Sequence, residues 1–204
     1  MIVEFQSLTP AQVYFHLIQV LVPRPIAWVL SENASGSFNL APFSYFNAVC
    51  SDPPLILLSV GQRPEGGHKD TRVNIEQRGD FVVHMAHSEL LDPLNASAAS
   101  LPPEESEQAQ LGLALAEFPG SRLPRLGDCR IAMACSCYRI DEIGNAPQSL
   151  IYGRVEQLYI SDEVAGRDAK GRLKVDAAAM DPLGRLGAGE YAAFGQVLRR
   201  ARPD

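Results

Sequence analysis

The sequence predicts a mainly β protein of the α+β class, with an antiparallel barrel and a few peripheral helices. Three short runs rich in β-branched or aromatic residues, 26–30, 55–60 and 81–85, are flanked by turn residues and predict buried strands. Two runs of twelve residues, 129–140 and 149–160, are much longer than the usual strand. Strands of that length are typical of a sheet that wraps around a closed or half-closed barrel.

The N-terminal part predicts a helix and then a hairpin. Thr9 and Pro10 are the residue types of an N-cap and a first helical position, and the apolar run after them predicts a helix to about residue 21. Two prolines shortly afterwards end it. Polar residues 32–37 predict a hairpin loop, and the segment PFSYFNAV that follows alternates like a further barrel strand.

The remaining helices are short. Asp70 begins a helix that Gly79 ends, because glycine suits the left-handed position after a helix. A second helix is expected to start at Asp92 and its following proline. The stretch 100–125 is rich in Pro, Glu and Ala, and it predicts a long excursion over the surface with a helix at 103–113.

Composition limits the class of protein. With 204 residues, 46% of them apolar, the chain is expected to form a single domain over 1–204 that can bury a core. A net charge of −6 argues against nucleic acid as a partner. Glu4 lies where a signal peptide carries positive charge, and no apolar run reaches the ~18 residues of a membrane span, so we expect a cytoplasmic protein without membrane contact.

Several kinds of site have no motif. The sequence holds no P-loop, no dinucleotide-binding glycine pattern after a strand and no nucleophile elbow. Its four cysteines lack C-x-x-C spacing and are expected to be reduced. His84 and His87 lie in a strand pattern that places them on opposite faces, so we expect no metal site.

One segment, 39–54, points to a cofactor site. Its sequence NLAPFSYFNAVCSDPP mixes small, aromatic and hydroxyl residues with almost no charge. A strand followed by an irregular turn, with free backbone N–H groups and slim side chains, suits a flat heteroaromatic ligand that is hydrogen-bonded along its edge.

The next segment favours a phosphate. In GQRPEGGHKDT, Arg63, Lys69 and Thr71 lie before and at the start of a helix, where unpaired N–H groups and a partial positive charge stabilise anions. The alternative is that Asp70 or Thr71 caps the helix and Lys69 is solvated. Arg24, between two prolines, either serves a phosphate or carboxylate or is a surface arginine.

Three aromatic residues have two possible roles each. Trp28 and Tyr45 either stack on a ligand ring or belong to the core, which is the commoner place for an aromatic residue in a strand. Tyr191, in a glycine-rich tail, is either a lid or a dimer contact.

Taken together and in order, these motifs resemble the flavin reductase-like FMN-binding proteins of the split β-barrel class. The resemblance is carried by PRPIAWV, NLAPFSYFNAVCSDPP, LLSVGQRP with HKDT, FVVHM and RLGAGEY. It covers most of the chain apart from 100–125, and its first seventy or so residues are the specific part.

The resemblance implies FMN, with the ring along Ser44 to Ala48 and the 5′-phosphate near Ser59, Arg63, Lys69 and Thr71. It also implies a homodimer in which the partner's C-terminal region covers the flavin. The complete set of expected cofactor-binding residues is Arg24, Ser44, Tyr45, Phe46, Asn47, Ala48, Ser59, Gly61, Arg63, Lys69, Asp70, Thr71 and Tyr191.

The implied function is an oxidoreductase that passes hydride or electrons from NAD(P)H through FMN to free flavin or another acceptor, such as a monooxygenase. Many family members carry a Gly-Asp-His motif associated with nicotinamide binding, where this chain has Ala146, Pro147 and Gln148. Glutamine can donate a hydrogen bond but carries no charge. An FMN-binding electron carrier without nicotinamide activity is therefore the alternative, and a pyridoxamine-phosphate oxidase-like barrel, which would want a more basic phosphate pocket, is a third.

Overall fold

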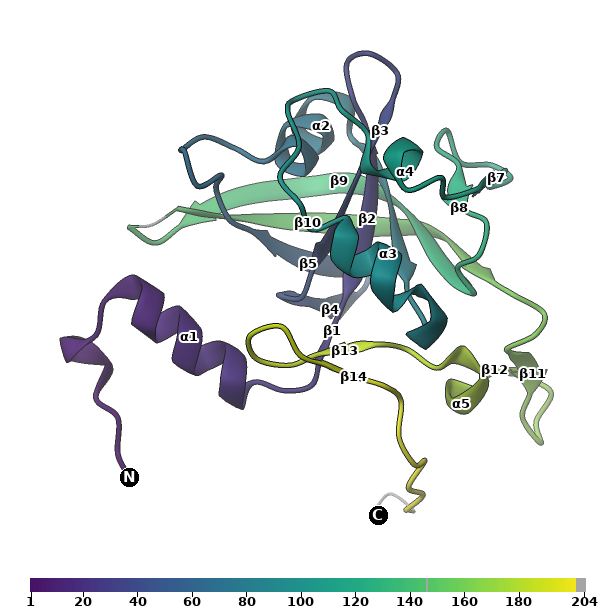
Figure 1. Cartoon of the computed structure of the whole chain (residues 1–204). Coiled ribbons are helices and arrows are strands. Elements are labelled where there is room, and N and C mark those ends of the chain that lie inside the picture. The colour runs from purple at the N-terminus through teal and green to yellow at the C-terminus, as the bar shows by residue number, and fades with distance from the viewer. Residues whose placement is uncertain (146, 201–204) are drawn as a thin grey trace.

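A computed structural model describes residues 1–145 and 147–200. Ala146, in the stretch that corresponds to the Gly-Asp-His motif, and residues 201–204 lie outside the described residues. Its centre is a seven-stranded antiparallel sheet in the order β3-β2-β6-β9-β10-β5-β4 (Figure 1). The strands are β2 (Ala27–Glu32), β3 (Phe38–Phe43), β4 (Phe46–Ser51), β5 (Pro54–Val60), β6 (Asp80–Met85), β9 (Ile131–Ile143) and β10 (Gln148–Ile160). The prediction of a mainly β protein with two long strands is confirmed.

The order of the strands shows how the sheet closes. β3 and β4 lie at opposite ends of the sheet, yet only Ser44 and Tyr45 separate them along the chain. The sheet must therefore curl until its two edges meet at this turn, where the Ser59 N–H donates to the Tyr45 carbonyl at 2.8 Å. The result is a barrel with a gap in its wall between β3 and β4.

Helices and small sheets surround the barrel. The helices are η1 (Phe5–Ser7), α1 (Pro10–Val20), α2 (Asp70–Arg78), η2 (Ser88–Leu90), α3 (Leu91–Ala96), α4 (Glu107–Gln110) and α5 (Ala177–Met180). One small sheet joins β1 (Arg24–Pro25), β13 (Gly184–Arg185) and β14 (Tyr191–Ala192). Two further pairs are β7 (Leu115–Ala116) with β8 (Arg125–Leu126), and β11 (Ala165–Arg167) with β12 (Leu173–Val175).

The core has two parts, one on each face of the sheet. β2 serves both, because Trp28 and Leu30 pack in one cluster while Val29 packs in the other with Phe81 and Ile151. This explains why the strand is a continuous apolar run rather than an alternating one. Trp28 is fully buried and its indole N–H donates to the Ser97 hydroxyl at 2.8 Å, so the core alternative for this residue is correct.

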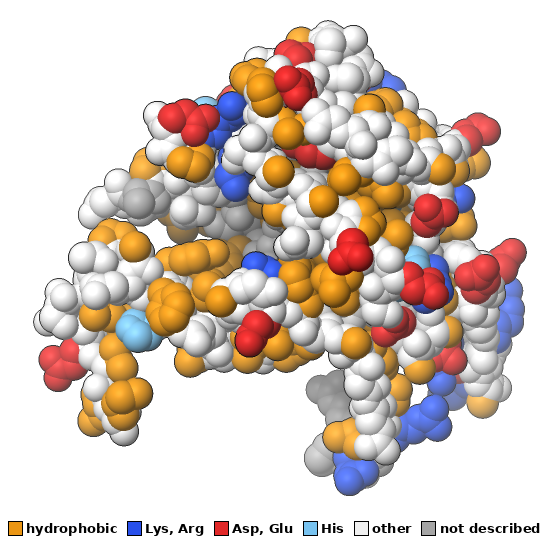
Figure 2. All heavy atoms as spheres, in the orientation of Figure 1, with side chains coloured by type: hydrophobic (Ala, Val, Ile, Leu, Met, Phe, Trp, Pro, Cys, Tyr) orange, Lys and Arg blue, Asp and Glu red, His pale blue; other side chains and the backbone are white. Residues whose placement is uncertain are grey.

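Helix α1 stands beside the barrel rather than against its core. The predicted cap is confirmed: the Gln12 N–H donates to the Thr9 hydroxyl at 3.3 Å, and the Thr9 N–H donates to the Gln12 amide oxygen at 2.9 Å. Ile18 is the one buried residue of the helix, whereas Tyr14, Phe15 and Val20 are more than half exposed. Figure 2 shows these apolar side chains gathered along α1 and the N-terminal arm, at the lower left.

Three predictions about secondary structure need correction. PFSYFNAV is not one strand, because it turns at Ser44 and continues as β4. The helix predicted at 103–113 is reduced to α4, and the second helix begins at Leu91 after a 3-10 turn rather than at Asp92. The segment 100–125 runs over the surface for most of its length, as predicted, but it also contributes to the core. It supplies buried Phe118 and Leu123 to the core, and such isolated apolar residues leave no periodic signal.

Among the described residues, no helix is long and apolar enough to cross a membrane.

His84 lies at the centre of the sheet and is engaged on both ring nitrogens. Nδ1 faces the Trp28 carbonyl at 3.1 Å, and Nε2 accepts from the Leu126 N–H at 2.9 Å. These partners define a neutral ring with its proton on Nδ1. Burial is the main reason why the pKa of His84 falls from 6.5 to about 4.

This histidine predicts a loss of stability in mild acid. Between pH 6.5 and 4 the unfolded chain binds a proton that the folded ring does not, so the free energy of unfolding falls as the pH falls. From pH 7.5 to 5.0 we expect His84 to account for a loss of about 2 kcal/mol. Urea unfolding of the wild type and His84→Gln at both pH values measures it, and equal losses in the two proteins would contradict the assignment.

Candidate functional site

A large cavity lies at the gap in the barrel wall, between the barrel, α1, α3 and the β13–β14 hairpin (Figure 1). Its volume of about 630 Å³ is within the range of small-molecule sites. It is lined by Leu8, Pro10, Val13, Tyr14, Leu17, Ile26, Pro42, Phe43, Ser44, Tyr45, Ser59, Gly61, Lys69, Asn95, Ala98, Gln148, Arg185 and Tyr191.

The turn between β3 and β4 forms the wall of this cavity nearest the gap. Within the described residues, the backbone N–H groups of Ser44 and Tyr45 have no hydrogen-bond partner, while the Tyr45 carbonyl is bound by Ser59. Burial, and the neighbouring hydroxyl of Tyr14, raise the pKa of Tyr45. Tyr45 therefore stays neutral at pH 7, and the turn presents donors next to aromatic surface.

Arg24 supports this wall from behind. It is only 8% exposed, so it is not a surface arginine. Its guanidinium donates to the carbonyls of Ile18, Leu21 and Leu186 at 2.6–2.8 Å and to the Ser44 hydroxyl at 3.3 Å. One side chain thus ties together the end of α1, the C-terminal hairpin and the turn at the gap. Its contact with a cofactor remains a prediction.

Lys69 is a cation in the lining of the same cavity. Its Nζ lies 5.7 Å from the centre of the Phe43 ring, and no hydrogen bond or ion pair to this amine is formed within the described residues. Burial lowers its pKa. The side chain is half-buried, so the alternative of a fully solvated lysine is wrong.

A smaller cavity of about 120 Å³ adjoins the large one and shares Pro42, Phe43, Lys69 and Ala98 with it. Arg63, Asp70 and Thr71 line only the smaller cavity. The two cavities are therefore neighbours, and Lys69 lines both of them.

The start of α2 faces the smaller cavity without a side-chain cap. Lys69 occupies the N-cap position and makes no capping bond, and Asp70 instead pairs with Arg63 at 2.5 Å. The Thr71 hydroxyl accepts from the Asn39 amide at 2.9 Å. The alternative in which Asp70 or Thr71 caps this helix is therefore wrong, and the first N–H groups of α2 remain available to an anion.

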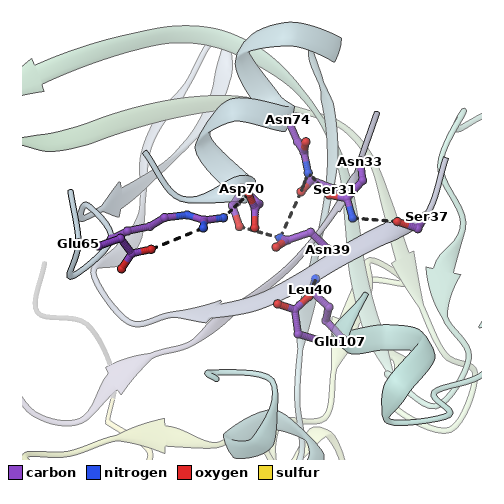
Figure 3. A network of polar contacts seen from close by, with 11 residues as sticks. Ser31, Asn33, Ser37, Asn39, Leu40, Glu65, Asp70, Asn74 and Glu107 are labelled. Atoms are coloured by element: carbon purple, nitrogen blue, oxygen red, sulfur yellow. Dashed lines mark hydrogen bonds and ion pairs between the residues drawn. The ribbon is translucent and has the colours of Figure 1, made fainter. Parts of the chain in front are cut away.

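A buried polar network holds α2 against the barrel (Figure 3). Asn74 donates to Asn33 at 2.8 Å and to Ser31 at 3.2 Å, and Asn39 links Ser31 to Thr71. Behind it, Glu107 accepts from the Leu40 N–H at 2.9 Å, and burial raises the pKa of this carboxyl. Because buried polar groups need such partners, the network keeps the helix start in place.

The structure brings together most of the expected site residues. The two cavities are lined by nine of them, namely Ser44, Tyr45, Ser59, Gly61, Arg63, Lys69, Asp70, Thr71 and Tyr191. Arg24 lines neither cavity and contacts the Ser44 hydroxyl from behind. Phe46, Asn47 and Ala48 lie on β4 outside both cavities, with Asn47 and Ala48 exposed. Tyr191 faces the large cavity, and its hydroxyl donates to the Asn95 amide oxygen at 3.0 Å.

Sequence reasoning missed several lining residues, including Tyr14, Asn95 and Arg185. Tyr14 carried a signal, because the 11-residue helix is apolar except for the stripe of Gln12, His16 and Gln19, and so wide an apolar face must cover something besides the core. Asn95 and Arg185 carried none. Gln148 also lines the cavity, 3.5 Å from the Ser59 hydroxyl, at the position where the family motif has its histidine.

Comparisons with known proteins agree with this fold. Nitrilotriacetate monooxygenase component B of Bacillus cereus superposes with a TM-score of 0.88 at 32% identity, over 98% of each chain. The 2-nitrobenzoate 2-nitroreductase of Pseudomonas fluorescens superposes with a TM-score of 0.88 at 30% identity, over 100% of this chain and 96% of that one. The split barrel domain of a Shewanella frigidimarina NCIMB 400 protein shares the fold, with a TM-score of 0.83 at 16% identity over 98% and 96% of the two chains.

The fold is thus an antiparallel split β-barrel, as the sequence predicted. Residues 20–175 match the family model of the flavin reductase like domain, which is more than half of the chain. The chain belongs to the flavin reductase-like domain family.

Proposed function

We propose that this chain, as a single domain, binds FMN in the two neighbouring cavities and acts as a flavin-dependent oxidoreductase. The observation that carries the proposal is Lys69, a half-buried cation that has no hydrogen-bond or ion-pair partner among the described residues and that lies between an aromatic-lined cavity and an uncapped helix start. A flat ring joined to a phosphate by a polar chain fits that arrangement. Lys69, Thr71 and the N–H groups of α2 would hold the phosphate.

The chain's own groups would orient the ring and exclude water. The free N–H groups of Ser44 and Tyr45 would bind its polar edge, and fixed donors beside a low-dielectric wall stabilise negative charge more strongly than water does. Tyr14 and the other side chains of α1 would cover it from the solvent side. FMN, when bound, supplies the hydride and electron chemistry.

The family and the fold support a reductase that takes hydride from NAD(P)H and passes electrons to free flavin or another acceptor. The likeness to a monooxygenase component supports a monooxygenase as the partner. The likeness to a nitroreductase supports a small organic acceptor. The exposed apolar side chains of α1 support a homodimer, in which a second copy would cover them.

The second candidate function is an FMN-binding electron carrier. Gln148 favours it, because this residue lines the cavity and cannot supply the charge of the histidine in the family motif. The two functions differ in whether NAD(P)H reduces the bound flavin.

An anaerobic absorbance experiment decides between them. FMN-loaded protein is mixed with NADH and then with NADPH while the flavin band near ~450 nm is followed. Bleaching within seconds supports the reductase, and flavin that stays bound and oxidised supports the carrier. Failure to bind FMN would overturn the proposed site.

Lys69 provides a test of the phosphate assignment. We expect Lys69→Ala to weaken FMN binding by about 1–3 kcal/mol, because it removes a charged hydrogen bond. Riboflavin, which lacks the phosphate, should bind both proteins equally. Fluorescence titration of each flavin measures the effect, and Lys170→Ala, in an exposed turn, is the matched control. Equal loss of both flavins would show that Lys69 does not bind the phosphate.

A further inference from the structure

The large cavity has an unusual charge for this chain. Among its described lining residues, the charged ones are Lys69 and Arg185, both cations, although the whole chain has a net charge of −6. Lys69 also belongs to the smaller cavity. Arg185, Asn95 and Tyr191 line only the large one, so they mark a separate end of the site.

A second arginine lies directly beside Arg185. Arg24 and Arg185 are register partners in the antiparallel pair of β1 and β13, so both side chains project from the same face. Like charges in directly opposite positions destabilise a pair of strands unless something compensates them. The pair therefore creates a local excess of positive charge next to the cavity.

None of the described contacts of the two arginines includes a carboxylate. Arg24 donates to three carbonyls and a hydroxyl. Arg185 donates from Nη2 to the Ala188 carbonyl at 2.6 Å, and its guanidinium carbon lies 4.3 Å from the centre of the Tyr191 ring. Its Nη1 is buried without a hydrogen-bond partner within the described residues. A buried, unpaired charged donor is costly, so an acceptor that reached Nη1 after a small shift of the side chain would relieve that cost.

We propose that Arg185 binds the carboxylate of a small planar acid that occupies the cavity beside the flavin, and that the electron acceptor of this protein belongs to that class of acids. The proposal rests on the proposed function, because the phosphate of FMN would take the other end of the site at Lys69. The planar fork of a guanidinium matches a carboxylate with two parallel hydrogen bonds.

The other walls favour a compact aromatic acid over a larger anion. Tyr14, Leu17 and Ile26 offer apolar surface for a flat ring, and Asn95 is the neighbouring amide. A dinucleotide pyrophosphate with its two riboses needs many more polar partners than this end of the cavity provides.

The probe is para-fluorobenzoate, compared with the uncharged para-fluorobenzamide, and fluorine NMR measures the binding of each to FMN-loaded and flavin-free protein. We expect the acid to bind the loaded wild type at least about 10-fold more tightly than the amide. Arg185→Gln should weaken the acid roughly 10- to 100-fold and leave the amide unchanged. Arg139→Gln is the matched control, because it removes an exposed arginine that also stacks on a tyrosine.

Titration of FMN and riboflavin into the same variants separates the two proposals. If the wild type binds no FMN, the proposed function fails, and preference for the acid in flavin-free protein still supports the anion site. If Arg185→Gln weakens FMN but not riboflavin, Arg185 holds the flavin phosphate and the inference is overturned. Equal binding of acid and amide to the wild type also overturns it. If Arg185→Gln fails to fold, two other measurements test the proposal. One is the comparison of acid and amide binding to the wild type, and the other is acid binding to Arg185→Lys, which keeps the positive charge but lacks the planar guanidinium.

Discussion

Replacing Arg24 by alanine is expected to destabilise the protein by about 3–5 kcal/mol and to abolish tight flavin binding. The change leaves three carbonyls without their charged donor, among them Ile18 at 2.6 Å and Leu186 at 2.8 Å. It also frees α1 and the C-terminal hairpin, which form two walls of the large cavity. Urea unfolding measures the stability, and FMN titration measures the loss of the site.

Arg24→Lys is the informative companion. A lysine keeps the charge but cannot reach acceptors on three segments at once, so an intermediate loss of stability is expected. Arg154→Gln, which removes an exposed arginine from β10, should change the free energy of unfolding by less than about 0.5 kcal/mol. An Arg24→Ala protein as stable as this control would show that the hydrogen bonds of Arg24 do not hold the two walls.

A methyl group at Gly153 is expected to cost about 1–3 kcal/mol, because the core beside it has no room. A Cβ built at this position would lie 2.4 Å from Cζ of Phe81, and Phe81 is 1% exposed in the centre of the second core cluster. Gly153 lies in β10 at a shift in the register with β9. Gly153→Ala therefore displaces a rigid ring, and urea unfolding measures the loss.

Gly189→Ala is the matched control, since nothing lies within 4 Å of a Cβ there and its backbone conformation is not left-handed. The double variant Gly153→Ala with Phe81→Leu tests the mechanism. If the clash with the ring is the cause, the double variant is more stable than the sum of the two single changes predicts. If the free-energy changes of the two substitutions are strictly additive, the cost of Gly153→Ala does not come from a clash with the Phe81 ring.

Much of the fold follows from local patterns. The capping residues Thr9 and Gln12 mark the start of α1, Gly79 marks the end of α2, and the two long apolar runs become β9 and β10. These signals are readable because capping and side-chain periodicity depend on residues close together in the chain. The contribution of segment 100–125 to the core could not be predicted, because its buried residues Phe118 and Leu123 are isolated and contact distant neighbours instead of following a local period.

The candidate site could likewise be predicted only in part from the sequence. Segment 39–54 and the start of α2 carry their own evidence, namely small and aromatic residues around a turn and a basic residue before a helix. The burial of Arg24 could not be predicted, because its acceptors come from the end of α1 and from Leu186, 162 positions away.

By itself, the sequence determined the class of fold, the approximate positions of the longer elements and the two segments that face the cavity. Only the tertiary structure decided that Tyr14, Asn95 and Arg185 line the same cavity, and that Arg24 and Arg185 stand side by side. The physical reason is that a cavity wall consists of contacts between elements far apart in the chain. Those contacts arise when the sheet curls and brings β3 back to β4, and no local periodicity encodes which side chains then face each other.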